Sequence, residues 1–234
     1  MIKVVCFDFF NTLAYFYPSR EETYSNICRD LGISVTPEAL GESLPKADAY
    51  WRAENYKSRI SDREQKEKFA VYAEYGVRIL KGAGVEVTGD VGLQILSTAS
   101  QVGFKFELYE DSLPTLEVLK KRGFKLGLLS NVGQDIDSDC EELGLEPFLD
   151  FKVTSFEVGF DKPHPEIFLA ALKKAAVTPE EILYVGDQYD QDILGARNVG
   201  IKAILIKRNG SPPSTYDCPV ISSLPQITEY LSPQ

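Results

Sequence analysis

Groups able to take part in catalysis or metal binding occur at four places in the sequence, each following a stretch expected to form a strand. They are three carboxylates, two hydroxyls, one amide and one ammonium, at Asp8, Asp187, Asp192, Thr12, Ser130, Asn131 and Lys162. Carboxylates held close together repel one another unless a cation or a proton compensates their charge. Mg²⁺ is the natural partner, since it prefers hard oxygen ligands and keeps positions for water and substrate phosphate. If the fold brings the three aspartates together, they predict a magnesium site.

Short apolar runs supply the strands that would carry these groups to one place. Val4-Val5-Cys6-Phe7 is a continuous apolar run, which favours a strand buried on both faces of a parallel sheet. Four similar runs follow, at Leu126 to Leu129, Phe151 to Thr154, Ile182 to Val185 and Ala203 to Ile206. Helical patterns such as Leu113 to Lys121 and Pro165 to Ala176 separate them, so the sequence predicts an α/β fold with a Rossmann-like parallel sheet. Ligands bind at the carboxyl ends of the strands in such sheets, which is where the polar groups are expected.

Residues 16–107 differ in character from the rest of the chain, with much helical periodicity and few strand-like runs. Ser19-Arg-Glu-Glu22 and Ser61-Asp-Arg-Glu64 fit the capping-box pattern, in which a Ser hydroxyl and a Glu carboxylate satisfy amides at the start of a helix. We therefore expect an α/β core made of residues 1–15 and 108–234, interrupted by an inserted α-helical domain.

The composition of the chain limits the classes of binding partner and the cellular location that we expect. The chain has 234 residues, a formal net charge of −10 and a pI near 4.8, which disfavours nucleic acid and anionic membrane surfaces as partners but leaves a small anionic substrate open. Four scattered cysteines form no CxxC pair, so we expect reduced thiols rather than a zinc site or disulfides. Since no signal-peptide pattern and no apolar run of about 18 residues is seen, we expect a cytoplasmic monomer or homodimer that acts on a small molecule without binding a membrane.

The order and spacing of four segments resemble the four motifs of the haloacid dehalogenase superfamily. These segments are Asp8-Phe9-Phe10-Asn11-Thr12-Leu13, Ser130-Asn131, Asp161-Lys162-Pro163-His164-Pro165 and Gly186-Asp187-Gln188-Tyr189-Asp190-Gln191-Asp192. The resemblance spans the chain outside the helical insert, and the insert lies where this family carries its helical cap. Any one motif would be a weak signal, whereas all four in order, each after an expected strand, are specific. The resemblance implies a hydrolase.

The resemblance also implies a role for each acidic position. Asp8 would be the nucleophile, forming a covalent intermediate that water then hydrolyses. Asp8 and Asp187 would bind Mg²⁺ through their side chains, and Phe10 through its backbone carbonyl. Asp192 would either be a further metal ligand or hold the metal-binding residues in place without contacting the metal.

The remaining groups would handle the substrate and the loop. By the resemblance, Ser130 and Lys162 would hold a phosphate opposite the nucleophile, with Asn131 beside them in the same substrate-binding region. Lys162 would supply positive charge and Ser130 a hydroxyl donor. Thr12 would order the loop around the nucleophile.

Phe10 departs from the pattern of most phosphatases in this family, which carry an Asp two residues after the nucleophile. That Asp protonates the leaving oxygen and then activates water, and general acid–base catalysis of this kind contributes about 10²–10⁴-fold. Phenylalanine cannot transfer a proton, so an ordinary alkyl phosphate should be a poor substrate unless another group substitutes. Asn11 replaces a usual glycine, a minor change because Asn tolerates left-handed backbone well.

Three functions follow from this departure. The first is a Mg²⁺-dependent hydrolase, of phosphatase type, acting on a small organic phosphate. The second is a 2-haloacid dehalogenase, in which Asp8 attacks carbon and the halide leaves without a proton; such family members use no metal and usually lack the Gly-Asp of the fourth motif. The third is a catalytically weak protein that binds a phosphorylated ligand. Because Gly186, Asp187 and Asp192 are all present, we favour the first.

Several other conspicuous residues have simpler structural interpretations. Tyr50, Trp51 and Tyr56 are expected in the core of the helical insert. Asp190 is expected to cap the helix that follows it. His164, the single histidine, lies between two prolines at an expected helix start, which favours a structural role.

Overall fold

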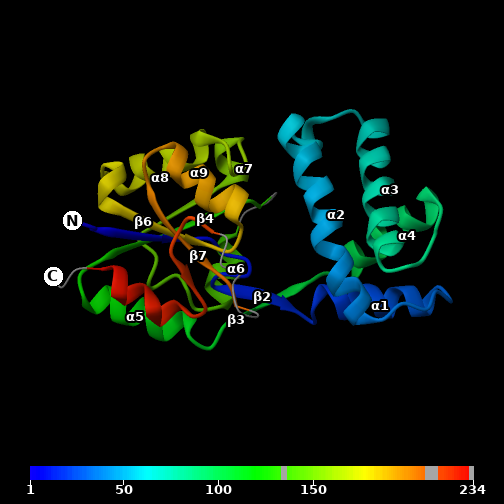
Figure 1. Cartoon of the computed structure of the whole chain (residues 1–234), viewed down its shortest axis with the longest axis horizontal. Coiled ribbons are helices and arrows are strands. Elements are labelled where there is room, and N and C mark those ends of the chain that lie inside the picture. Colours follow the sequence, from blue (N-terminus) through cyan, green and yellow to red (C-terminus); the bar gives the residue numbers. More distant parts are fainter. Residues whose placement is uncertain (133–135, 209–215, 232–234) are drawn as a thin grey trace. The chain divides into compact units, whose positions relative to one another are not determined.

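The computed structural model describes residues 1–132, 136–208 and 216–231. The chain forms two compact units, one made of residues 1–15 and 106–234 and the other of residues 16–105 (Figure 1). The first unit contains the large sheet and the second is helical, so the predicted α/β class with a helical insertion is confirmed.

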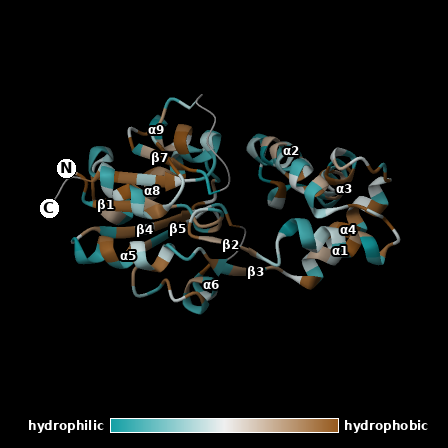
Figure 2. Cartoon of the chain, turned by 60° about the horizontal axis from the view of Figure 1, so that its bottom comes forward, coloured by the Kyte–Doolittle hydropathy of each residue, from teal (hydrophilic) through white to brown (hydrophobic). Residues whose placement is uncertain are grey.

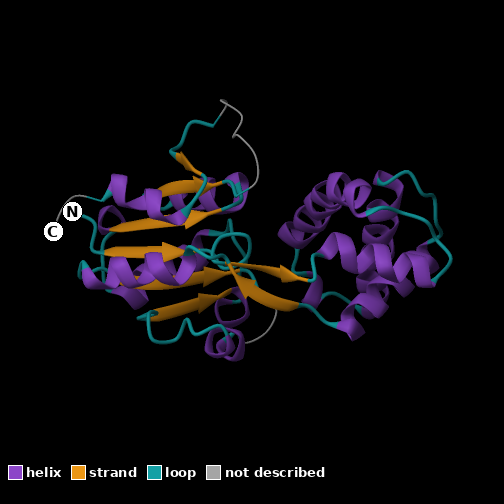
Figure 3. Ribbon diagram, turned by 90° about the horizontal axis from the view of Figure 1, so that it is seen from below, coloured by secondary structure: helices purple, strands orange, loops and turns teal. Residues whose placement is uncertain are grey.

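The large sheet has six strands in the order β5-β4-β1-β6-β7-β8, all parallel (Figure 3). Their bounds are β1 Val4–Phe7, β4 Lys125–Ser130, β5 Phe151–Thr154, β6 Ile182–Gly186, β7 Lys202–Ile206 and β8 Val220–Ile221. Each of the five predicted apolar runs lies in one of the first five of these strands, and β8 was not predicted because only two residues pair there. In the register, Val5 lies between Leu126 of β4 and Leu183 of β6.

Both faces of the sheet are covered, which explains why the strands are continuously apolar (Figure 2). Alternate side chains of a strand point to opposite faces. Val5 and Phe7 of β1 belong to a cluster with α5 (Ser112–Lys121), whereas Val4 and Cys6 belong to a cluster with α8 (Pro165–Ala175) and α9 (Leu194–Asn198). The short helices α6 (Asp137–Glu142) and α7 (Ser155–Val158) complete this unit with two 3₁₀ turns, Pro179–Glu181 and Leu224–Tyr230, and a π-helical turn, Tyr189–Ile193.

The helical unit consists of α1 Arg20–Asp30, α2 Pro37–Lys57, α3 Gln65–Gly82 and α4 Gly89–Val102, with a 3₁₀ turn at Ile60–Asp62. Its core is built from apolar residues of all four helices, including Ile27, Leu44, Ile79 and Ile95. The capping box predicted at Ser19 is confirmed, since its hydroxyl accepts the Glu22 amide and the Glu22 carboxylate accepts the Ser19 amide.

The second predicted capping box is wrong. Helix α3 begins at Gln65 after an N-cap at Glu64 whose side chain makes no capping hydrogen bond, and the Ser61 hydroxyl donates to Asp62 instead. The physical reason lies in Arg63. Its guanidinium donates to Glu54 and to Ser58, which ties this segment to the end of α2 instead of to the first turn of α3.

The chain passes between the two units through a two-stranded sheet of β2 (Ala14–Tyr17) and β3 (Lys105–Leu108). Across the residues for which the structure is described, no helix is both long enough and apolar enough to cross a bilayer.

Candidate active site

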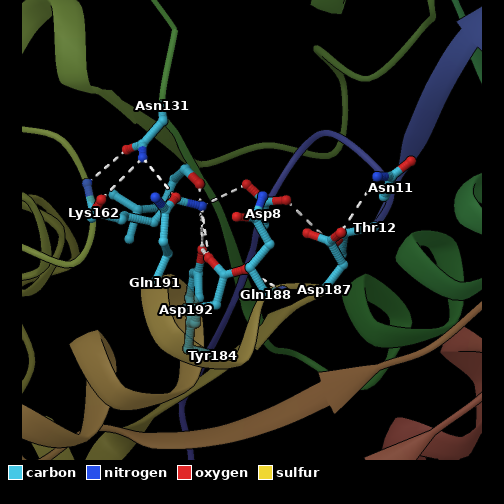
Figure 4. Close-up of polar contacts among 11 residues, drawn as sticks. Asp8, Asn11, Thr12, Asn131, Lys162, Tyr184, Asp187, Gln188, Gln191 and Asp192 are labelled. Atoms are coloured by element: carbon cyan, nitrogen blue, oxygen red, sulfur yellow. Dashed lines mark hydrogen bonds and ion pairs between the residues drawn. The ribbon is translucent and has the colours of Figure 1, made fainter. Parts of the chain in front are cut away.

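The polar groups singled out in the sequence gather at the carboxyl ends of three adjacent strands (Figure 4). Asp8 follows β1, Ser130 ends β4 and Asp187 follows β6. Because β4, β1 and β6 are neighbouring parallel strands, their carboxyl ends meet at one edge of the sheet. The geometry thus brings the three segments together, and Lys162 reaches the same place from the loop between α7 and α8.

A buried ion-pair network lies at the centre of this site. The Lys162 ammonium is 2.6 Å from Asp8 Oδ1 and 2.7 Å from Asp192 Oδ1, and all three residues are at most 5% exposed. Tyr184, inside β6, donates its hydroxyl to Asp192 Oδ1 at 2.9 Å and accepts a hydrogen bond from Lys162 at 3.0 Å. Tyr184 was not predicted to belong to the site, although its hydroxyl is the single polar side-chain group within the apolar run Ile182 to Val185.

Oxygen atoms suited to a metal ion lie beside this network. Asp8, Asp187 and Asp192 each place one carboxylate oxygen within 4.8 Å of the others. Asp187 Oδ2 accepts a 3.3 Å hydrogen bond from the Asn11 amide, whereas its buried Oδ1 has no hydrogen-bond partner among the described residues. A shielded carboxylate oxygen without a donor is costly, and a hard cation would satisfy it. The donor set therefore fits Mg²⁺.

Electrostatics support the need for a further positive charge. Burial, opposed by Lys162 and reinforced by Asp192, raises the pKa of Asp8 to about 6. Burial and the charges of Asp8 and Asp192 raise the pKa of Asp187 to about 8. Burial alone would lower the pKa of Lys162, but the two aspartates it contacts outweigh this and raise it. One lysine therefore does not neutralise three carboxylates, and a proton or a metal ion is needed.

The contacts of Asp192 resemble those of a supporting residue more than those of a metal ligand. Its Oδ1 accepts hydrogen bonds from Lys162 and Tyr184, and its Oδ2 accepts one from the Gln188 backbone amide at 2.9 Å. Both oxygens thus have protein donors. Of the two roles considered for Asp192 in the sequence, these contacts favour support, and direct metal binding stays a prediction.

Asn131 holds the backbone of the lysine segment. Its Oδ1 accepts the Lys162 amide at 2.7 Å, and its Nδ2 donates to the Lys162 carbonyl at 3.2 Å and to Gln191 Oε1 at 3.1 Å. These contacts are with the protein itself, so the predicted substrate contact of Asn131 stays a prediction. Neighbouring Ser130 is buried at the end of β4.

The loop after β1 has the conformation that its sequence favours. Asn11 has a φ of +57°, the left-handed conformation that Asn tolerates. The Thr12 hydroxyl donates to Asp8 Oδ2 at 3.3 Å, and its role in ordering the nucleophile loop stays a prediction. The Phe10 ring is half-buried, with its centroid 6.5 Å from that of Phe106. The metal contact predicted for the Phe10 carbonyl stays a prediction.

Two basic residues that directly follow β7 were not predicted to lie near the site. Lys207 Nζ donates to the Asp187 carbonyl at 2.6 Å. The Arg208 guanidinium pairs with Asp111 at 2.7 Å, donates to the Thr12 carbonyl and stacks on the Tyr109 ring at 3.9 Å. The rule that polar groups collect at strand ends could have identified both, since they directly follow Ile206.

Of the residues that were given a structural role from the sequence, some have the predicted environment and others do not. Trp51 stacks on Tyr72 with ring centroids 5.3 Å apart. Trp51 and Tyr50 both pack against the core of the helical unit, as predicted. The prediction for Tyr56 is wrong, because this side chain is 58% exposed. Asp190 does not cap a helix: it is exposed within the π-helical turn, whose N-cap is Gln188. His164 directly precedes α8, and its ring lies 5.7 Å from that of Phe160.

Comparison with known proteins agrees with this geometry. The family described as haloacid dehalogenase-like hydrolase matches residues 2–200. A glyceraldehyde 3-phosphate phosphatase of Methanopyrus kandleri is 31% identical over 220 residues, which cover 89% of this chain and 85% of that protein. The crystal structure of a HAD phosphatase from Thermococcus onnurineus is similar with a TM-score of 0.59 and 26% identity, covering 100% of this chain and 99% of that one.

A second solved structure supports the fold. The HAD-hydrolase YfnB from Bacillus subtilis is similar with a TM-score of 0.70 at 20% identity, covering 98% of each chain. The family match spans most of the sequence, and four expected motif segments meet at one sheet edge. This chain therefore belongs to the haloacid dehalogenase-like hydrolases, as its sequence motifs predicted.

Proposed function

We propose that this protein is a Mg²⁺-dependent phosphatase that uses Asp8 as its nucleophile on a small organic phosphate. The observation that carries this proposal is the cluster of Asp8, Asp187 and Asp192, with the shielded Asp187 Oδ1 lacking a partner among the described residues. The 31% identical relative is a glyceraldehyde 3-phosphate phosphatase, which supports phosphate as the transferred group and suggests glyceraldehyde 3-phosphate as one compound to test.

In this reaction an oxygen of Asp8 attacks phosphorus, the bond from phosphorus to the leaving oxygen breaks, and an aspartyl phosphate forms. Water then hydrolyses that intermediate, releasing phosphate and restoring Asp8. Lys162 holds Asp8 in place at 2.6 Å and adds positive charge in a buried site. Bound Mg²⁺, held by Asp8 and Asp187, would neutralise negative charge on the carboxylates and on the phosphate. We also propose that the helical unit serves as the cap that encloses the substrate, as the family resemblance implies.

Phe10 limits which phosphates react well. In the segment from Asp8 to Leu13, the residues after the nucleophile are Phe9, Phe10, Asn11, Thr12 and Leu13, and none has a carboxyl or imidazole proton to give. A leaving oxygen of high pKa departs poorly without a proton, whereas an aryl or acyl leaving group departs as an anion. We therefore expect the rate to depend steeply on the pKa of the leaving group.

The test compares phosphate release from p-nitrophenyl phosphate and from glyceraldehyde 3-phosphate, each with Mg²⁺ and with EDTA. We expect Mg²⁺-dependent release that is faster from the aryl ester, and loss of release in Asp8→Asn. Phe10→Asp should raise release from the alkyl ester by about 10²-fold and from the aryl ester much less, since general acid catalysis matters most for a poor leaving group.

The same Phe10 favours one second candidate, a dehalogenase acting on a 2-halo acid, because a departing halide needs no proton. Halide release from 2-chloropropionate, measured beside the phosphate assay, separates the two. Halide release that is insensitive to EDTA, with no phosphate release, would overturn the phosphatase proposal. The carboxylate cluster favours the phosphatase.

A further inference from the structure

Tyr184 is the one residue of the buried network that neither the motif comparison nor the proposed reaction assigns. It lies inside β6 and is 1% exposed. Its ring packs edge-on against Phe168 with centroids 5.6 Å apart. A phenylalanine would provide that packing equally well, so the ring does not explain the hydroxyl.

The hydroxyl completes the hydrogen bonding of Lys162. A lysine ammonium has three N–H donors and no acceptor. The Lys162 ammonium donates to Asp8 Oδ1 at 2.6 Å, to Asp192 Oδ1 at 2.7 Å and to Tyr184 Oη at 3.0 Å, one acceptor for each donor (Figure 4). All three N–H groups are therefore engaged, and Lys162 acts on a phosphate through its charge in this arrangement.

The same hydroxyl also fixes the carboxylate beside the lysine. It donates to Asp192 Oδ1 at 2.9 Å, while the Leu129 carbonyl lies farther away at 3.4 Å. Lys162, Asp192 and Tyr184 thus form a closed triangle of hydrogen bonds, and Asp8 is attached to it through the lysine alone. The backbone side of Lys162 is held separately by Asn131.

We propose that Tyr184 is a positioning residue that holds the Lys162 ammonium on Asp8. Without the hydroxyl, one buried N–H donor loses its acceptor, which is an expensive state for a charged group. The ammonium would then rotate or draw closer to Asp192 to recover a partner, and its contact with Asp8 would lengthen. The kinetic consequence of this inference rests on the proposed phosphatase function.

The test uses the full chain with Tyr184→Phe and the matched variant Tyr75→Phe. Tyr75 is also a buried tyrosine whose hydroxyl links a cation to a carboxylate, since it accepts from Arg20 at 2.7 Å and donates to Asp48 at 2.6 Å. Loss of either hydroxyl should lower thermal stability. At a temperature where both variants are folded, we expect kcat on p-nitrophenyl phosphate to fall about tenfold or more in Tyr184→Phe, with KM changed less than about threefold, and to stay near wild type in Tyr75→Phe.

A second readout does not depend on turnover. In protein labelled with ¹⁵N-lysine, a buried ammonium with three hydrogen bonds should give an observable Nζ signal, assigned by its loss in Lys162→Arg. We expect this signal to shift or broaden in Tyr184→Phe and to stay unchanged in Tyr75→Phe. An unchanged Lys162 signal in Tyr184→Phe, or a changed signal with wild-type kcat, would overturn the inference. Absence of phosphatase activity in the wild-type chain would instead contradict the proposed function, while the lysine signal would still decide the contact.

Discussion

Gly186 leaves the space that the Asp192 carboxylate occupies: a Cβ atom at position 186 would lie 2.4 Å from Asp192 Cγ. Real Cβ atoms do not approach a carboxylate carbon so closely, and the carboxylate is fixed on its other sides by Lys162, Tyr184 and the Gln188 amide. The glycine of the fourth motif is thus explained by a steric requirement. The absence of a side chain at Gly186 lets the end of β6 lie directly against Asp192, which binds Lys162.

Gly186→Ala should therefore displace Asp192 and, through it, Lys162. We expect kcat/KM for p-nitrophenyl phosphate to fall about 10²-fold, because a shift of about 1 Å in a catalytic group has that effect. The matched control is Gly41→Ala in α2, where the added Cβ meets only a Glu21 side-chain carbon at 3.8 Å. Wild-type kinetics in folded Gly186→Ala would show that Asp192 can move without consequence.

Magnesium binding should weaken as the pH falls. Burial, with the charges of Asp8 and Asp192, raises the pKa of Asp187 to about 8 in the metal-free protein. A carboxyl with a raised pKa keeps its proton at higher pH, and a metal ion binds only the carboxylate, so protons compete with the ion below that pKa. We expect the Kd of Mg²⁺ to rise by up to about tenfold for each pH unit below about pH 8.

Isothermal titration calorimetry with Mg²⁺ between about pH 6 and pH 9 checks this. Asp187→Asn provides the control, because it removes both the charge and the titrating proton and should abolish measurable binding. A Kd that stays constant over this range would contradict the proton competition.

The parts of the site that follow strands were predictable, because parallel strands place their carboxyl ends at one sheet edge. Asp8 and Asp187 were identified in this way. Tyr184 was not, since strand periodicity says which face a side chain takes but not that a hydroxyl within the core meets Lys162. Ser61 was misinterpreted because a capping pattern is local, whereas the competing contacts of Arg63 come from the end of α2.

Close packing of α3 on α4 gives a stability prediction for the helical unit. A Cβ on Gly76 would lie 2.5 Å from the Gly92 carbonyl oxygen, and rigid backbone cannot move aside cheaply. Gly76→Ala should destabilise this unit by about 1–3 kcal/mol, as overpacking does. Trp51 is the single tryptophan of the chain and lies in α2, so its fluorescence reports unfolding of this unit. Gly41→Ala, in an open helical position, should instead be neutral or slightly stabilising.

The half-buried pair of Arg20 and Asp48 makes the stability of the helical unit depend on pH. The guanidinium contacts both carboxylate oxygens, at 2.8 and 2.9 Å. Burial alone would raise the pKa of Asp48, but the hydrogen bond and charge of Arg20, with the Tyr75 hydroxyl, outweigh it and lower the pKa. A carboxyl with a lowered folded-state pKa contributes stability above its unfolded pKa of about 3.9, and that contribution is lost as the pH falls through the folded value.

Asp48→Asn should accordingly destabilise the unit at pH 7 by about 2 kcal/mol, because it leaves a half-buried guanidinium without its counter-charge. As the pH falls from about 4 through the lower folded-state pKa of Asp48, the wild-type carboxyl becomes protonated and resembles the asparagine in charge and shape, so the two proteins should converge in stability. Urea unfolding followed by Trp51 fluorescence, at neutral pH and at successively lower pH, measures the difference. A difference that persists undiminished at low pH would show that Asp48 stabilises the unit through its shape and neutral hydrogen bonds rather than through its charge.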